Sequence, residues 1–183
     1  MKKLLNSELE RKSLEEFKKA QKLPVVLVLD NVRSLNNVGS IFRTADAFLV
    51  QSICLCGITA CPPHRDIQKT ALGATESVDW SYYIKTSLAI RELKEKGFQV
   101  ISIEQVEESI FLDDFQPDYK QKYAFVFGHE VHGVDQEIVD LSDTSIEIPQ
   151  YGIKHSFNIS ISAGIVLWDY HLKTKLNKKG AVK

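Results

Sequence analysis

The chain has 183 residues, of which 44% are hydrophobic and 26% are charged, and its formal net charge is −1. These values are ordinary for one soluble globular domain. No run approaches the ~20 apolar residues that span a bilayer, and the lysine-rich N-terminus has no apolar core of signal-peptide type. We therefore expect a single domain over residues 1–183, located in the cytoplasm and without a membrane partner.

Basic side chains gather at both ends of the chain. Residues 1–22 carry seven basic and four acidic side chains, and residues 171–183 carry five lysines and no acid. Either end could lie against a polyanion, because charges act mainly within ~8 Å at physiological salt. The alternative for each end is an ordinary solvated terminus.

Hydrophobic periodicity and turn residues predict strands that alternate with helices. Ser7 and Glu10 form a capping-box pattern, which predicts a short N-terminal helix over about residues 7–21. Residues 58–66 are expected to form a proline-containing loop. The expected strands are 25–29, 52–56, 78–84, 98–103, 123–127 and 145–148.

The expected helices after the first strand begin at residue 36 or 37, at residue 87, near residue 135 and at residue 158. The last helix is expected to end near Leu176, within a basic C-terminal tail over about residues 173–183. This alternation predicts an α/β fold with a mostly parallel sheet and helices on both faces.

Three cysteines, Cys54, Cys56 and Cys61, lie within eight positions. Cys54 and Cys56 are two apart on an expected strand, so both thiols should point to one face. His64 follows closely, but the spacing is not that of a zinc site and no second cysteine pair exists. Reduced, partly buried thiols are therefore expected, and no metal site.

The first motif is Asn37-x-Gly39-x-x-x-Arg43, at the start of the helix that follows the first strand. Asn36 or Asn37 is expected to cap this helix. Arg43 lies four residues after Gly39 and leans toward the helix N-terminus, where free N–H groups attract anions. The motif therefore predicts a phosphate or other anion site, the alternative being a surface arginine on an amphipathic helix.

The second motif is Gly128-x-Glu130-x-x-Gly133, which reads as a strand, a tight glycine loop and a helix start. Glu130 replaces the glycine at which a pyrophosphate would approach in a dinucleotide fingerprint, and its carboxylate would repel phosphates. The loop is better suited to a ligand with hydroxyls or a cationic centre. His129 and His132 flank Glu130, but they are too few to predict a metal site.

The third motif runs from Ile148-Pro149 to Ser156-x-Asn158-x-Ser160, between a strand and the last helix. Alternating positions in an extended stretch would aim Ser156, Asn158 and Ser160 one way. Ser156 or Asn158 is also a natural helix cap. The helix that follows is apolar nearly all round, which predicts burial in the core or at a subunit interface.

Together, the three motifs resemble the SpoU/TrmH-like branch of the SPOUT superfamily, the tRNA/rRNA ribose 2′-O-methyltransferases. The resemblance spans about residues 24–172 and is carried by Arg43, Glu130, Ser156 and Asn158, and by the segment DNVRSLNNVGSIFRTADAF. It implies S-adenosyl-L-methionine as cofactor, an RNA substrate (tRNA first, rRNA second), an obligate homodimer, and a deep trefoil knot over roughly residues 120–170.

The resemblance also implies roles for particular residues. Arg43, Glu130 and Asn158 are the expected catalytic residues, and Asn37, Arg43 and Ser156 are expected to contact RNA. The residues expected to bind the cofactor are Glu104, Gly128, Gly133, Ile148, Ser156 and Phe157. Gln150, Phe157 and Ile159 depart from the usual family pattern, and no separate RNA-binding domain precedes the core.

An arginine is effectively always protonated, so Arg43 is expected to hold a phosphate and stabilise the developing alkoxide, not to act as a base. Three alternatives stay open. They are a non-catalytic RNA-binding relative, a SPOUT enzyme that methylates a base nitrogen, and a flavodoxin-like module that binds a small molecule.

Overall fold

The computed structural model describes residues 1–5 and 8–180, with side chains described as far as Leu176. The strands are β1 (Leu23–Asp30), β2 (Val50–Cys56), β3 (Asp79–Tyr83), β4 (Phe98–Ile103), β5 (Ile110–Phe111), β6 (Lys122–Phe127) and β7 (Thr144–Glu147). The helices are α1 (Leu14–Lys19), α2 (Leu35–Ala47), α3 (Arg65–Ala71), α4 (Ala74–Ser77), α5 (Thr86–Glu95), α6 (Gln136–Leu141) and α7 (Ile159–Gly180).

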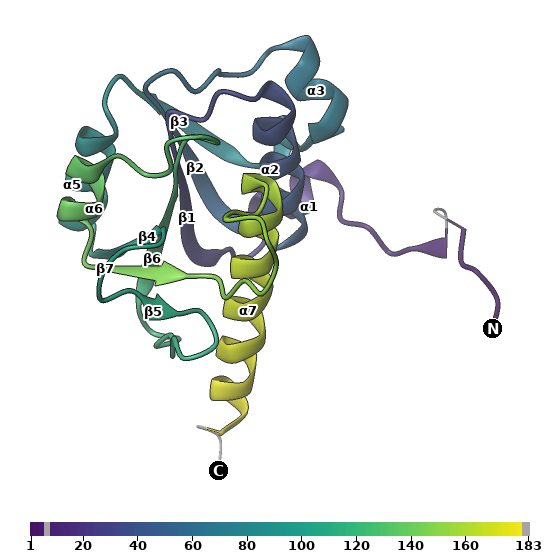
Figure 1. Cartoon of the computed structure of the whole chain (residues 1–183). Coiled ribbons are helices and arrows are strands. Elements are labelled where there is room, and N and C mark those ends of the chain that lie inside the picture. Colours follow the sequence, from purple (N-terminus) through teal and green to yellow (C-terminus); the bar gives the residue numbers. More distant parts are fainter. Residues whose placement is uncertain (6–7, 181–183) are drawn as a thin grey trace.

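The strands form a single seven-stranded sheet in the order β3-β2-β1-β6-β4-β7-β5, visible in Figure 1. Every neighbouring pair in it is parallel. Parallel neighbours require crossover connections, which place helices over the sheet. The predicted α/β class with a mostly parallel sheet is therefore confirmed.

Helices cover both faces of the sheet, and alternate residues of β1 contact the two layers. Val25, Leu27 and Leu29 belong to a core shared with α2, α3 and α7. Val26 and Val28 belong to a second core shared with α5 and α6. Both cores are apolar, so β1 is a continuous hydrophobic run, as a strand covered on both faces requires.

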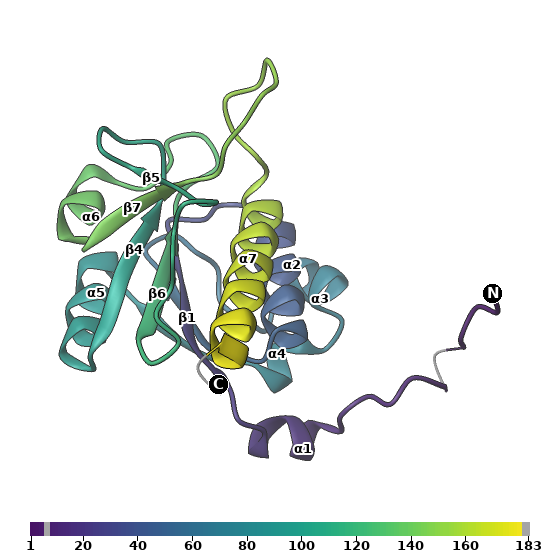
Figure 2. The same cartoon turned by 90° about the horizontal axis from the view of Figure 1, so that it is seen from below.

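Helix α7 lies alongside α2 on one face of the sheet, and the loop before α7 projects away from the domain (Figure 2). Residues 151–158 of that loop are all exposed. Within the described residues, no helix is both long and apolar enough to cross a membrane.

The predicted N-terminal helix is shorter than expected and begins later. Ser7 lies outside the described residues, and α1 is capped instead by Ser13, whose side chain and that of Glu16 form a capping box. Ser13 and Glu16 have the same spacing as Ser7 and Glu10, so the pattern does not distinguish the two starts. Burial of Phe17 in the core favours the second position.

Several other boundaries differ from the expectations. Ser34, not Asn36 or Asn37, caps α2, because its hydroxyl accepts the backbone N–H of Asn37 at 3.3 Å. Helices α3 and α4 and the two-residue strand β5 were not predicted, since such short elements carry almost no periodicity. Helix α7 continues beyond Leu176 to Gly180, so the first part of the predicted basic tail is helical.

The two cysteines of β2 point to one face of the sheet, as predicted. Cys54 and Cys56 are buried and point into the same apolar core. Loss of solvation on burial raises the pKa of Cys54 to about 11, which keeps its thiol protonated and unreactive at neutral pH.

Candidate active site

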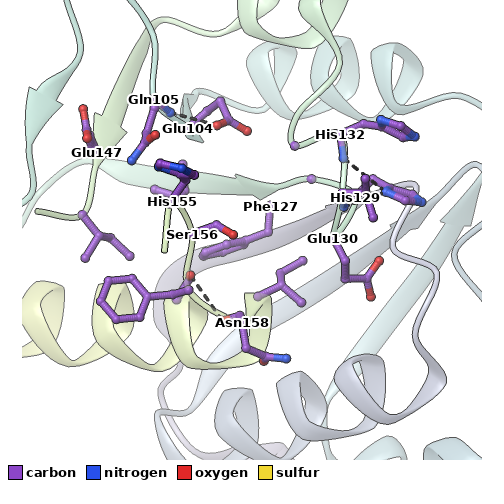
Figure 3. A pocket seen from close by; sticks show the side chains of 18 of the residues that line it. Glu104, Gln105, Phe127, His129, Glu130, His132, Glu147, His155, Ser156 and Asn158 are labelled. Carbon is purple, nitrogen blue, oxygen red and sulfur yellow. Dashed lines mark hydrogen bonds between the residues drawn. The ribbon is translucent and has the colours of Figure 1, made fainter. Parts of the chain in front are cut away.

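The carboxyl ends of β4, β6 and β7 open into a pocket of about 520 Å³. Three segments line it, namely residues 103–105, residues 127–133 and part of the segment 146–162 (Figure 3). Ligands of parallel α/β sheets bind beyond the carboxyl ends of the strands, and the volume is typical of a small-molecule site. The second and third sequence motifs thus meet around one cavity.

All the residues that the resemblance assigned to cofactor binding line this pocket. They are Glu104, Gly128, Gly133, Ile148, Ser156 and Phe157. Two of the expected catalytic residues, Glu130 and Asn158, line it as well. The fold therefore gathers into one pocket residues that lie as much as 54 positions apart in the sequence.

The two glycines of the second motif allow the loop to close tightly on itself. A Cβ atom on Gly128 would overlap the backbone of Gly133, and one on Gly133 would overlap the carboxylate of Glu104. Gly133 also has a φ of +70°, which favours glycine. The space that these glycines leave is used by the protein, because Glu104 accepts the backbone N–H of Val134 at 2.8 Å.

Glu130 joins the second motif to the first. Its carboxylate accepts the backbone N–H groups of Arg33 at 3.0 Å and Ser34 at 2.9 Å, and the side-chain amide of Asn37 at 2.9 Å. The amide of Asn158 then donates to Asn37 Oδ1 at 3.1 Å. One hydrogen-bonded network therefore connects all three motifs.

The network fixes the charge of Glu130. Burial would raise the pKa of its carboxyl, but the donors of Asn37, Arg33 and Ser34 outweigh burial and hold the pKa below the ordinary 4.5. The N-terminus of α2 thus already receives an anion from within the chain. The carboxylate of Glu130 thus lies beside the N-terminus at which the sequence predicted a phosphate or other anion.

Arg43 lies apart from the pocket in the single chain. Its side chain is exposed, and it is not among the residues that line the cavity. Asn37 is six residues earlier on α2, so Arg43 lies about 9 Å further along the helix axis. Within the described residues, its exposed guanidinium forms no hydrogen bond or ion pair.

Gly39 lies at a close contact between α2 and α3. A Cβ atom here would overlap the backbone oxygen of Ile67 and the hydroxyl of Thr70, both on α3. Thr70 also donates its hydroxyl to the backbone oxygen of Asn36 at 2.9 Å. Gly39 therefore allows α3 to pack closely against α2.

The expectation that Ser156, Asn158 and Ser160 alternate along an extended stretch is wrong for Ser160, which lies inside α7. Asn158 Oδ1 accepts the backbone N–H of Ser160 at 2.9 Å and its hydroxyl at 2.6 Å. Asn158 thus caps α7 with its oxygen while its amide nitrogen holds Asn37, and it ties the helix to the network.

Several other residues line the pocket that were not predicted to do so, among them Gln105, His129, Glu147, Gln150 and His155. Glu147 ends a strand directly before Ile148, and Gln105 directly follows Glu104. Polar residues at the carboxyl ends of buried strands were the available signal for these two. His155 lies on an irregular loop whose path the sequence does not define.

The pocket lining is acidic. It contains the carboxylates of Glu104, Glu130 and Glu147, whereas no lysine or arginine occurs among its described lining residues. Carboxylates attract cationic centres and accept hydrogen bonds from hydroxyl groups, and they disfavour phosphates. The fold and the pocket are therefore those of an α/β protein that binds a cationic or hydroxyl-bearing ligand at the carboxyl ends of its strands.

Comparison with known proteins identifies the family. Residues 24–168 match the model of the SpoU rRNA Methylase family, and the chain belongs to this family. The chain is 31% identical over 144 residues to the 23S rRNA (guanosine-2'-O-)-methyltransferase RlmB of Neisseria meningitidis. That alignment covers 79% of this chain and 56% of the relative, so the chain spans little more than half of that protein's length.

A second relative is the tRNA (guanosine(18)-2'-O)-methyltransferase of Aquifex aeolicus, which is 30% identical over 86% of this chain and 74% of the relative. Two solved structures have the same fold. The A. aeolicus TrmH/SpoU tRNA modifying enzyme has a TM-score of 0.79 at 24% identity, covering 90% of this chain and 84% of the other. The AdoMet-bound rRNA methyltransferase from Sinorhizobium meliloti has a TM-score of 0.75 at 28% identity, covering 85% and 60%.

Proposed function

We propose that this protein transfers a methyl group from S-adenosyl-L-methionine to a ribose 2′-hydroxyl of RNA, with tRNA as the first candidate substrate and rRNA as the second. The observation that carries the proposal is the network in which Glu130, Asn37 and Asn158 join three motifs beside one acidic pocket. The relative named for tRNA is covered over 74% of its length and the one named for rRNA over 56%, which favours tRNA.

The pocket suits this cofactor in size and in chemistry. A volume of about 520 Å³ lies within the range of small-molecule sites. The cofactor has a sulfonium, an ammonium and a ribose, and an acidic lining suits these cationic and hydroxyl groups. Glu104, Gly128, Gly133, Ile148, Ser156 and Phe157 would hold it, and when bound it supplies an already activated methyl group.

The protein's task is then to position the RNA. Glu130 and Asn158 would act as positioning residues, because their side chains hold the N-terminus of α2 and the start of α7 against the pocket. Ser156 lines the pocket and Asn37 bonds to Asn158, which also lines it, so Asn37 and Ser156 would contact the RNA that reaches the pocket. Arg43, which stays protonated, would hold a neighbouring phosphate and stabilise the alkoxide that forms as the hydroxyl loses its proton.

We further propose that the protein acts as a homodimer formed through α7. One face of this helix is apolar yet open, with Ile161 54%, Trp168 59%, Leu172 43% and Leu176 57% exposed. Ile161 and Trp168 line a largely apolar groove together with Thr44 of α2. An open apolar face of this extent is typical of an interface between identical chains.

A second copy in this groove would explain the position of Arg43. Arg43 directly precedes Thr44, which lines this groove, and its side chain is exposed. It would then face the partner's pocket and not its own. Such an arrangement supports an active site that is complete only in the dimer.

The proposal includes a deep trefoil knot over roughly residues 120–170. The strand order supports it, since β6 lies between β1 and β4, and β7 lies between β4 and β5. The C-terminal segment must therefore return to the middle of the sheet after β4 is in place. The same proposal locates the enzyme in the cytoplasm, where tRNA and rRNA are modified.

Incubation of the purified protein with total RNA and methyl-labelled S-adenosyl-L-methionine tests the activity. A 2′-O-methyl group protects the adjacent phosphodiester from alkali, so label should appear in alkali-resistant dinucleotides. Label in mononucleotides would instead indicate methylation of a base. RNA binding without label would indicate a non-catalytic relative, and calorimetry without cofactor binding would favour the flavodoxin-like module.

A further inference from the structure

The loop after β6 presents two stacked imidazole rings at the mouth of the pocket. The ring centroids of His129 and His132 are 4.8 Å apart, with an angle of 27° between the planes. His132 is exposed, and both residues line the pocket on the side of Glu130 (Figure 3). Neither ring belongs to one of the two buried cores.

The loop that carries the rings is held in one shape. His129 and Gly133 exchange backbone hydrogen bonds of 2.8 and 2.9 Å. The Nδ1 atom of His129 accepts the backbone N–H groups of Val131 at 3.0 Å and His132 at 3.4 Å. His129 is therefore committed to the loop, whereas the side chain of His132 has, within the described residues, its ring contact with His129 alone.

Metal binding does not explain the pair. Among the residues that the structure describes, no group of three His, Cys, Asp or Glu side chains could hold a metal ion. Packing does not explain it either, because His132 is solvent-exposed. What the pair offers is an aromatic face on a preorganised loop, immediately beside the network of Glu130, Asn37 and Asn158.

We propose that His132, supported by His129, is a stacking platform for a nucleobase of the RNA substrate. Proteins that recognise single-stranded or looped RNA commonly stack unpaired bases on aromatic side chains, histidine included. A rigid platform loses little conformational entropy on binding. A base held there would direct its ribose toward the pocket and the network. The inference rests on the proposed function, because it assumes that RNA is the substrate.

The test compares three substitutions of one side chain. His132→Ala removes the ring, His132→Phe keeps an aromatic face without ring nitrogens, and His132→Gln keeps polarity without a ring. Dissociation constants are measured for total tRNA in the presence of S-adenosylhomocysteine, so that no turnover occurs. Calorimetry with S-adenosyl-L-methionine and the melting temperature are recorded for each variant.

The platform predicts that the Ala and Gln variants bind tRNA about five- to a hundredfold more weakly, as expected for the loss of one base stack. The Phe variant should bind within about threefold of the wild type. Cofactor affinity and melting temperature should be unchanged in all three.

Equal weakening in the Ala and Phe variants, or full binding by the Gln variant, would overturn stacking in favour of a polar contact. Unchanged tRNA binding in all three would overturn the platform altogether. Loss of cofactor binding in the Ala variant would reassign His132 to the cofactor pocket and so overturn it too. If the wild type bound tRNA but transferred no methyl group, the proposed function would fail while the stacking result still stood.

Discussion

Glu130 is held by three donors, and two of them are backbone N–H groups next to the N-terminus of α2. A carboxylate in such a position is stabilised by the hydrogen bonds and by the helix dipole. It fixes the start of the helix that carries Arg43. Its contribution therefore depends on its charge, and hence on pH.

Substitution Glu130→Gln should lower the free energy of unfolding at pH 7 by about 1.5–3 kcal/mol, the usual effect of losing hydrogen bonds to a charged group. The folded-state pKa of Glu130 lies below 4.5, so its stabilisation is present above that pH and is lost as the pH falls through the folded value. Urea unfolding at pH 7, 5 and 3.5 should show the difference between wild type and variant shrinking only below about pH 4.5.

The exposed Glu107 provides a control for this comparison. Glu107→Gln should change stability by less than about 0.5 kcal/mol at any of these pH values. A difference for Glu130→Gln that stays constant down to pH 3.5 would contradict the role of its charge.

Arg43 is expected to affect transfer and not cofactor binding, because it lies outside the pocket of its own chain. Arg43→Ala should lower the rate of methyl transfer by about 10²–10³-fold or more, as for the loss of a donor that stabilises developing negative charge. The dissociation constant of S-adenosyl-L-methionine should stay within about twofold by calorimetry. Arg43→Lys, which keeps the charge but not the fork, should recover part of the rate. Retained activity in the Ala variant would remove Arg43 from the mechanism.

Helices α2 and α3 approach closely at Gly39, where a Cβ atom would overlap backbone and side-chain oxygens of α3. The close approach brings Thr70 within hydrogen-bond distance of Asn36. Packing of α3 therefore supports the first turn of α2, which also carries Asn37. The position of the first motif thus depends on α3, a helix that was not predicted from the sequence.

Gly39→Ala should destabilise the protein by about 1–3 kcal/mol, because overpacking a tight contact outweighs the gain in helix propensity. Gly152→Ala is the matched control, since no atom lies within 4 Å of the position of its Cβ. Thermal unfolding should separate the two variants by several degrees. Equal melting temperatures would show that α3 shifts to accommodate the added methyl group without a loss of stability.

The C-terminal helix α7 has one buried and one open apolar face. Ala163, Val166, Leu167 and Tyr170 face the core, whereas Ile161 and Trp168 face solvent. Lys173 belongs to the domain and not to a free basic tail, because it pairs with Asp169 at 2.9 Å and donates to the backbone oxygen of Leu112 at 2.6 Å. Lysines beyond it would have to provide any contact of this end with RNA.

Introducing a charge on the open face should separate the proposed dimer. Ile161→Asp is expected to shift the sedimentation coefficient to that of a monomer, because an unpaired buried carboxylate is costly to desolvate. Methyl transfer should fall with it if Arg43 acts on the partner's pocket. Leu88→Asp on α5 is the control, since Leu88 is 47% exposed on the opposite side of the sheet. A monomeric wild type would contradict the interface.

The class of fold could be inferred from local patterns in the sequence, whereas the residues expected around the pocket came from the family resemblance. Continuous apolar runs such as residues 25–29 mark strands covered on both faces, and glycines and polar residues at their ends mark ligand loops. Glu104, Gly128 and Ile148 are each placed at a strand end by such patterns. Strand ends meet at one edge of a parallel sheet, so these three residues are expected to lie near one another.

The tertiary structure alone decided how the motif residues are used. The sequence allowed the N-terminus of α2 to be an open anion site, but the fold brings Glu130 to it from 93 residues away. In the sequence, Gly39 lies four residues before Arg43, whereas in the fold α3 packs against Gly39. The local sequence determines which hydrogen-bonding groups a segment presents. Only long-range packing determines which other residues bind to these groups. Each of the three motifs can be recognised in the sequence by itself, but the hydrogen bonds that join them at Glu130 form only in the folded chain.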